Sequence, residues 1–284
     1  MNIETVYTLL NILQVSILTF VLWRLVLRMK TGSFTMVSVF YLYALILFLL
    51  SDIYWLVHGL LRPETRIPFG ANEIGEIGIY LMFSSLLNAV FKKEERFKEL
   101  LGATLLAGIF SLAVIALWIG WTGEWVKDIL SGLAFGYFAC TTIRSLIISN
   151  AFDKKRLSVL GVLAFVLLGL QGMIFVIPEA LGNILDIVCY CIMFAGMIWL
   201  FVFCIKTVRK AYSSSNGNGP NENIKKKSLA VSFLLSLWIH NALYMSNEYV
   251  YTVIFIIVSF NILIMYFSVA IYEDGAFSQR GVFK

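Results

Sequence analysis

Long apolar runs recur along the whole chain and constrain its fold more than any other feature. A helix of about 20 residues crosses a hydrocarbon core of roughly 30 Å. Only helices or closed barrels can span that core, and these runs lack the alternation of barrel strands. The sequence therefore predicts an all-α polytopic membrane helix bundle. Its nine transmembrane helices are expected at 5–28, 33–61, 71–91, 99–120, 124–148, 157–177, 180–208, 228–246 and 249–271.

Composition is typical of a membrane protein and argues against nucleic acid as a partner. Charged residues make up 14% of the chain and hydrophobic residues 60%, whereas soluble domains carry about 25% charged residues. The net charge of +5 is modest and does not suggest nucleic-acid binding. The four cysteines lie in apolar runs without metal-ligand spacing. We therefore expect no disulfide, metal or cofactor, and the lipid bilayer is the main partner.

The basic residues predict the orientation of the bundle in the membrane. Of 22 lysines and arginines, 17 fall in the loops after helices one, three, five and seven or near the C-terminus. Only three lie opposite, at Arg62, Arg66 and Lys127. Cytoplasmic loops are enriched in such residues. We therefore expect the N-terminus outside and the C-terminus in the cytoplasm of a cell membrane.

The sequence also suggests internal divisions and close helix contacts. Residues 211–224, AYSSSNGNGPNENI, cannot bury enough apolar surface to become ordered. They suggest a seven-helix bundle at 1–208, a flexible basic cytoplasmic linker at 209–227, and a two-helix extension with a short tail at 228–284. Two stripes of small residues predict closely packed helices. They are Ala103, Ala107 and Ser111, and Gly132, Gly136 and Cys140.

Polar residues inside the predicted helices gather in their outer halves. Ionisable side chains at membrane depth are costly and indicate function by default. Asp52 lies about 13 Å from the outer end of its helix, so no helix dipole explains it. We predict an outward-open cavity bordered by Asp52, with at least two of Glu76, Asp186 and His240 on its walls. The candidate ligand-binding residues are Asp52, His58, Glu73, Glu76, Asp186 and His240.

Local structure offers a second interpretation of some of these residues. Glu73 and Glu76 open a helix, where negative charge favours the dipole, and Arg62 or Arg66 are candidate partners. A structural role is slightly favoured for both. The spacing of Glu73, Glu76 and Tyr80 places them on one face of that helix. A lone histidine such as His240 is more often a hydrogen-bonded interior residue than a metal ligand.

One stretch of the chain resembles a known class of membrane region. Residues 51–87, SDIYWLVHGLLRPETRIPFGANEIGEIGIYLMFSSLL, resemble multi-pass membrane sensor regions of bacterial signalling proteins. Those regions often precede a histidine kinase or a diguanylate cyclase. The resemblance covers about an eighth of the chain. Because the fourteen-residue tail from Ile271 is too short for such a domain, it implies a separate cytoplasmic signalling partner.

Three functions are compatible with the sequence. The leading hypothesis is a membrane sensor or receptor-like module with an outward-facing polar pocket for a small-molecule or lipid ligand. The second is a proton- or cation-coupled transporter, and the third is an intramembrane enzyme acting on a lipid or envelope precursor. Motifs of soluble hydrolases, metalloproteases and nucleotide-binding enzymes are absent, so an enzyme is less favoured.

Overall fold

The computed structural model describes residues 3–31, 35–61, 70–91, 97–174, 176–215, 222–242 and 248–280. These ranges are helical and contain no strand, and seven of their helices are long and apolar enough to cross a membrane. The predicted class, a helical membrane bundle, is confirmed. The helices are α1 (Ile3–Thr31), α2 (Met36–Leu61), α3 (Ala71–Phe91), α4 (Phe97–Thr122), α5 (Trp125–Ile148), α6 (Lys154–Ile174), α7 (Glu179–Ser215), α8 (Glu222–Ala242) and α9 (Glu248–Arg280).

Six helices extend beyond a predicted bound, and two of the three largest extensions adjoin the predicted linker. Helix α7 continues to Ser215 and α8 begins at Glu222, so two parts of the segment 209–227 are helical. Only 216–221 between them lies outside the described residues. Helix formation costs little once a segment extends an already packed helix, because nucleation is the expensive step. The polar composition was therefore a poor guide to where the linker begins and ends.

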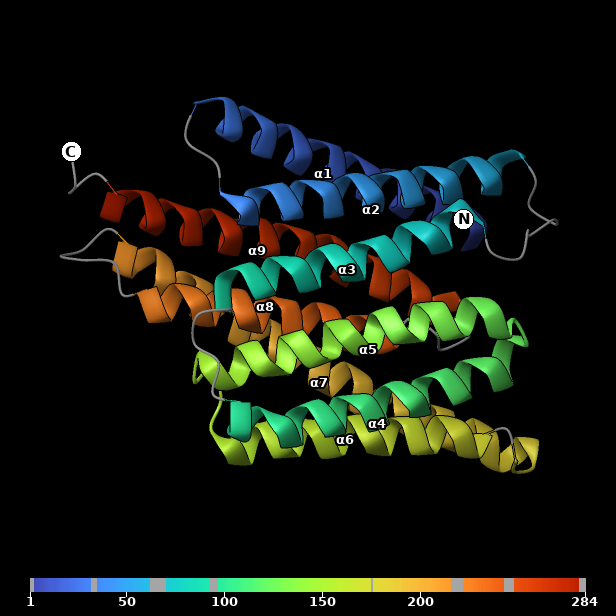
Figure 1. Cartoon of the computed structure of the whole chain (residues 1–284). Coiled ribbons are helices and arrows are strands. Elements are labelled where there is room, and N and C mark those ends of the chain that lie inside the picture. Colours follow the sequence, from blue (N-terminus) through green and yellow to red (C-terminus); the bar gives the residue numbers. More distant parts are fainter. Residues whose placement is uncertain are drawn as a thin grey trace.

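The helices run nearly side by side, and α1 begins at the end of the bundle opposite to that at which α9 finishes (Figure 1). We call the end at which α1 begins the outer end and the other the cytoplasmic end, following the predicted orientation. Helices α1, α2 and α9 pack together on one side. Helix α3 packs on α2 and α5, α4 on α5, and α6 on α7.

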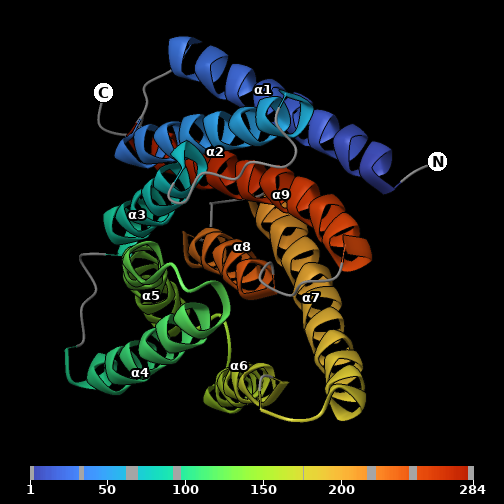
Figure 2. The ribbon, with the colours of Figure 1, turned by 90° about the vertical axis from the view of Figure 1, so that its right-hand side faces the viewer.

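Helix α8 lies in the middle of this arrangement (Figure 2). It packs against α7, α9, α5 and α3, and residues 228–239 are buried except for half-buried Ser236. Trp238 fixes it on α7, because its indole Nε1 donates a hydrogen bond to the Met193 carbonyl at 3.1 Å. The division into seven helices plus a two-helix extension therefore does not correspond to a division in the packing.

Small residues bring neighbouring helices close together, as their stripes predicted. A Cβ atom added to Gly136 would lie 2.1 Å from Ser111 Oγ, so only glycine fits against α4 there. Ser111 Oγ also donates a hydrogen bond to the Gly132 carbonyl at 2.9 Å. A Cβ atom on Gly78 of α3 would lie 2.7 Å from Leu47 of α2. These contacts fix α5 against α4 and α3, which carries Glu73 and Glu76, against α2.

Candidate functional site

Three polar side chains meet near the outer end of α3 and α8. His240 Nε2 lies 2.5 Å from Glu76 Oε1, and the Tyr80 hydroxyl donates to the same oxygen at 2.8 Å. Glu76 and Tyr80 are four residues apart on α3, which places them on one face. The side chains of His240 and Glu76 are 19% and 22% exposed. We call this group the Glu76–Tyr80–His240 cluster.

Aromatic rings surround this cluster and fix the histidine. The Tyr80 ring meets the His240 ring edge to face, with centroids 4.7 Å apart. Phe135 of α5 lies on another side of the imidazole, at 5.7 Å. Phe138 stacks on Tyr80 at 5.9 Å. Apolar walls of this kind lower the local dielectric, so hydrogen bonds to the Glu76 carboxylate are stronger than they would be in water.

The cluster is chemically an acid–base pair with a phenol attached. A carboxylate that accepts two donors on one oxygen is held in one orientation. The imidazole can take or release a proton, and its charge state decides whether the contact is an ion pair. A ligand that presents an amine or hydroxyl group can compete for the carboxylate. The group can therefore bind a polar ligand, hold a proton, or pass one on.

A buried charged layer lies one helical turn closer to the outer end. Lys127 Nζ is 3.9 Å from Glu73 Oε1 and 3.4 Å from Glu124 Oε2. Glu73 is 2% exposed, Lys127 4%, and Asp128 is fully buried. Arg62 and Arg66, the partners suggested by the sequence, lie outside the described residues. The structure thus pairs Glu73 with Lys127, and an ion pair this deeply buried costs several kcal/mol if one partner is removed.

Asp52 lies apart from this cluster, at the junction of α1, α2 and α9. Gln14 Nε2 donates to Asp52 Oδ2 at 2.7 Å, and Ser259 Oγ donates to Gln14 Oε1 at 3.5 Å. The prediction that Asp52 shares one cavity with two of Glu76, Asp186 and His240 does not match these contacts. Glu76 and His240 meet each other, whereas the hydrogen bonds of Asp52 go to α1. The outer polar residues therefore form at least two separate groups.

Two predicted residues remain, His58 on α2 and Asp186 on α7. His58 stacks on Tyr54, with ring centroids 5.8 Å apart. Asp186 is half-buried on α7 and makes no side-chain hydrogen bond or ion pair to another described residue. Ligand-binding roles for His58 and Asp186 stay predictions.

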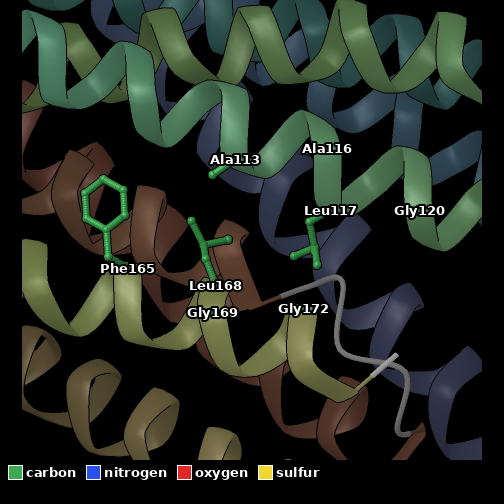
Figure 3. A pocket seen from close by; sticks show the side chains of 8 residues that line it. All are labelled: Ala113, Ala116, Leu117, Gly120, Phe165, Leu168, Gly169 and Gly172. Atoms are coloured by element: carbon green, nitrogen blue, oxygen red, sulfur yellow. The ribbon is translucent and has the colours of Figure 1, made fainter. Parts of the chain in front are cut away.

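An apolar cavity of about 540 Å³ lies between α4 and α6 (Figure 3). Ala113, Leu117 and Gly120 line one wall, and Phe165, Leu168 and Gly172 line the other. None of the predicted ligand-binding residues reaches it. It is therefore not the polar cavity that the sequence suggested.

Sequence reasoning missed a second polar group, at the cytoplasmic end. Glu273 Oε1 accepts hydrogen bonds from Thr35 Oγ1 at 2.7 Å and from the Ser38 amide at 3.2 Å, so it caps the start of α2. Arg28 of α1 pairs with Asp274 and donates to the Ala270 carbonyl at 2.9 Å. We call these residues the cytoplasmic cluster. Helix nine was expected to end at residue 271, which placed Glu273 and Asp274 in a tail.

Helix α8 also reaches this cytoplasmic end. Lys225, in its first turn, is 2% exposed, and burial lowers the pKa of its ammonium group, while nearby Asp274 opposes that shift. One turn on, Ser228 Oγ lies 3.2 Å from Ser268 Oγ of α9. The sequence places Lys225 in the predicted linker. Its burial could not be foreseen, because the polar residues before it gave no sign that α8 begins at Glu222.

The described residues contain no group of three or more histidine, cysteine, aspartate or glutamate side chains placed to hold a metal ion. Comparison of the chain with protein-family models, curated proteins and solved structures gave no match. The function of the protein is therefore inferred from the geometry of the site.

Proposed function

We propose that the protein is a multi-pass sensor of the cell membrane whose ligand enters from the outer side and binds at the Glu76–Tyr80–His240 cluster. One observation carries the proposal. The enclosed helix α8 holds His240 on Glu76 near its outer end and, near its cytoplasmic end, places Ser228 against α9. Ligand binding at the outer cluster can thus displace the cytoplasmic end of α8 without any large rearrangement.

The mechanism depends on the contacts of the cluster. A ligand with a hydrogen-bond donor competes with His240 for Glu76 Oε1, which also accepts the Tyr80 hydroxyl. Loss of the histidine contact removes the polar link between α8 and α3. Packed helices move between discrete arrangements because their interfaces interdigitate. The shift reaches Lys225 and Ser228, next to the basic cytoplasmic loops that a separate signalling partner would read.

The resemblance of residues 51–87 to bacterial membrane sensor regions supports the same function. That stretch includes Glu73, Glu76 and Tyr80, so it carries the α3 half of the cluster. The ligand then needs at least one donor group, such as an amine or hydroxyl, and either a soluble molecule or a lipid headgroup supplies one.

Transport is the second candidate, and one feature of α8 favours it. Ser228, Ser232, Ser236 and His240 occupy every fourth position along this helix. Their hydroxyls and the imidazole form a polar line along an enclosed helix, from Glu76 at the outer end to Ser268 near the cytoplasmic end. Proton and cation pathways use chains of this kind.

A cysteine reporter on α8 tests the sensor proposal. In a chain whose four cysteines are replaced by alanine, Asn223→Cys places a thiol at an exposed position in the first turn of α8. The rate at which this thiol reacts with a polar maleimide reports the position of the cytoplasmic end. We expect Glu76→Gln and His240→Phe each to change the rate severalfold. The double variant should change it no further, because both disrupt one contact.

The matched control places the thiol on a helix that packs on α7 and α4. Lys154→Cys lies in the first turn of α6, exposed on the same side. Its reaction rate should not respond to Glu76→Gln or His240→Phe. Unchanged rates at both positions, in variants that remain folded, would remove α8 as the transmitting element and overturn the sensor proposal.

A further inference from the structure

We propose that a small monovalent cation, with sodium as the simplest example, binds at the junction of α1, α2 and α9 between Asp52, Asn11, Gln14 and Ser259. This site is separate from the Glu76–Tyr80–His240 cluster, and the inference does not depend on the proposed sensor function.

The first argument is the charge of Asp52. Its side chain is buried, with 7% exposure, within an apolar helix. Gln14 donates to it at 2.7 Å, but among the described residues no lysine, arginine or histidine pairs with it. A carboxylate at membrane depth needs a counter-charge or a proton. A bound cation supplies the counter-charge.

The second argument is an amide oxygen without a donor. Asn11 is 2% exposed, and its Oδ1 receives no hydrogen bond from any described residue. Asn11 precedes Gln14 by three residues, so both lie on the same face of α1. That face is buried, and α1 packs on α2 and α9. A buried carbonyl oxygen left without a donor costs about 1–3 kcal/mol, which coordination to a cation would offset.

The chemistry of the donors selects the class of ligand. The site offers the Asp52 carboxylate, the amide oxygens of Asn11 and Gln14, and the Ser259 hydroxyl, and it includes no cysteine or histidine. Oxygen donors suit hard cations rather than transition metals. One carboxylate balances one positive charge, whereas a divalent ion would leave a net charge in a low-dielectric region. The geometry therefore points to a monovalent cation.

The polar residues of α1 continue from the site toward the outer end. Tyr7 lies four residues before Asn11 and is half-buried. Its ring packs edge to face on Phe255 of α9, with centroids 5.1 Å apart. Tyr7, Asn11 and Gln14 thus form one polar face from the outer end of α1 inward to Asp52.

Thermal unfolding of the purified full chain in detergent tests the site. Sodium chloride replaces N-methylglucamine chloride stepwise at constant ionic strength, so that only the cation changes. We expect a saturable rise in the unfolding temperature, because a ligand that binds only the folded state stabilises it. Asp52→Asn should abolish the rise, since the amide keeps the shape and loses the charge. Asn11→Ala should raise the half-saturating sodium concentration about tenfold, equivalent to about 1.4 kcal/mol.

Glu76→Gln is the control that separates this inference from the proposed function. It alters the other cluster and should leave the sodium-dependent rise unchanged. A wild-type protein without a saturable rise, or an equal rise in Asp52→Asn, would overturn the cation site. A third result would also overturn it. If lowering the pH raises the unfolding temperature whether or not sodium is present, and Asp52→Asn loses this rise, then Asp52 takes a proton and not a cation. If Asp52→Asn does not fold, the shifted sodium dependence of Asn11→Ala decides the question.

Discussion

The two ends of the bundle use charged residues for different purposes. At the cytoplasmic end, Glu273 caps the start of α2, and Arg28 of α1 pairs with Asp274 and donates to the Ala270 carbonyl within α9. Glu273 meets an amide that the start of α2 would otherwise leave unsatisfied, and Arg28 meets an opposite charge. At the outer end, His240 of α8 and Glu76 of α3 contact each other, and the rings of Tyr80 and Phe135 pack against the imidazole.

The kind of partner that a charged residue has is a better guide to a structural or functional role than the residue type is. A charge whose partner is a helix end needs no further reason to be there. The His240–Glu76 contact joins two side chains, remains about a fifth exposed, and connects the most enclosed helix to its neighbour. The Lys127–Glu73 pair lies between these cases, because it is buried and close to the first turns of α3 and α5.

The largest effect is expected at Lys127. Lys127→Met removes the cation that faces Glu73 and Glu124 while keeping a similar side-chain volume. Breaking a buried ion pair by removing one partner costs about 3–5 kcal/mol, because a charge is left uncompensated. The free energy of unfolding in mixed detergent–SDS micelles measures the loss. Adding Glu73→Gln should recover much of it.

Arg156→Met provides the matched comparison. Arg156 pairs with Asp153, but the two side chains are 59% and 63% exposed. An exposed pair contributes about 0.2–1 kcal/mol. A similar loss in both variants would mean that water reaches Lys127, and the outer layer would then be a solvated surface.

An intermediate effect is expected at Glu273. Glu273→Ala removes the acceptor for Thr35 Oγ1 and the Ser38 amide, and loss of a helix cap costs about 1–2 kcal/mol. The reaction rate of the thiol at position 223 should keep its dependence on Glu76. If Glu273→Ala keeps its stability but its thiol reaction rate no longer depends on Glu76, the cytoplasmic cluster takes part in signalling. The proposed difference between the two ends would then be wrong.

The sequence predicted the fold well and the site only in part. The length of an apolar run can be read directly from the sequence. The helices were therefore predicted, although only seven of the nine predicted transmembrane helices are long and apolar enough, in the described residues, to cross a membrane. The stripe of Gly132 and Gly136 likewise predicted a close contact, which Ser111 makes. Pairing between helices depends on their rotation and on which neighbours they meet. Sequence spacing could place Glu76 and Tyr80 together on α3, but not His240 of α8 against them.

Asp52 is an instructive failure of the same kind. Its depth correctly marked it as unusual, but depth carries no information on the partner. Its partner Gln14 lies on α1, and nothing in the sequence around Gln14 pointed to Asp52, 38 residues away. The cytoplasmic cluster was missed for a simpler reason: the ends of α8 and α9 were misplaced by several residues.

The smallest effect is expected at Ser228, and it distinguishes the sensor from the transporter. Its hydroxyl shares a hydrogen bond with Ser268 of α9 at 3.2 Å, and polar contacts between membrane helices contribute about 0.6 kcal/mol on average. Ser228→Ala should therefore lower the free energy of unfolding by about that much and leave the Glu76-dependent thiol reactivity at position 223 intact.

If the serine line of α8 instead conducts protons or cations, loss of the Ser228 hydroxyl interrupts the line near the cytoplasmic end. Proteoliposomes that contain the wild-type chain would then show an ion flux, measured with a pH-sensitive dye or a labelled cation, which Ser228→Ala and Ser232→Ala would each reduce. A sensor produces no flux in either form, so a flux that depends on these serines would replace the sensor proposal with transport.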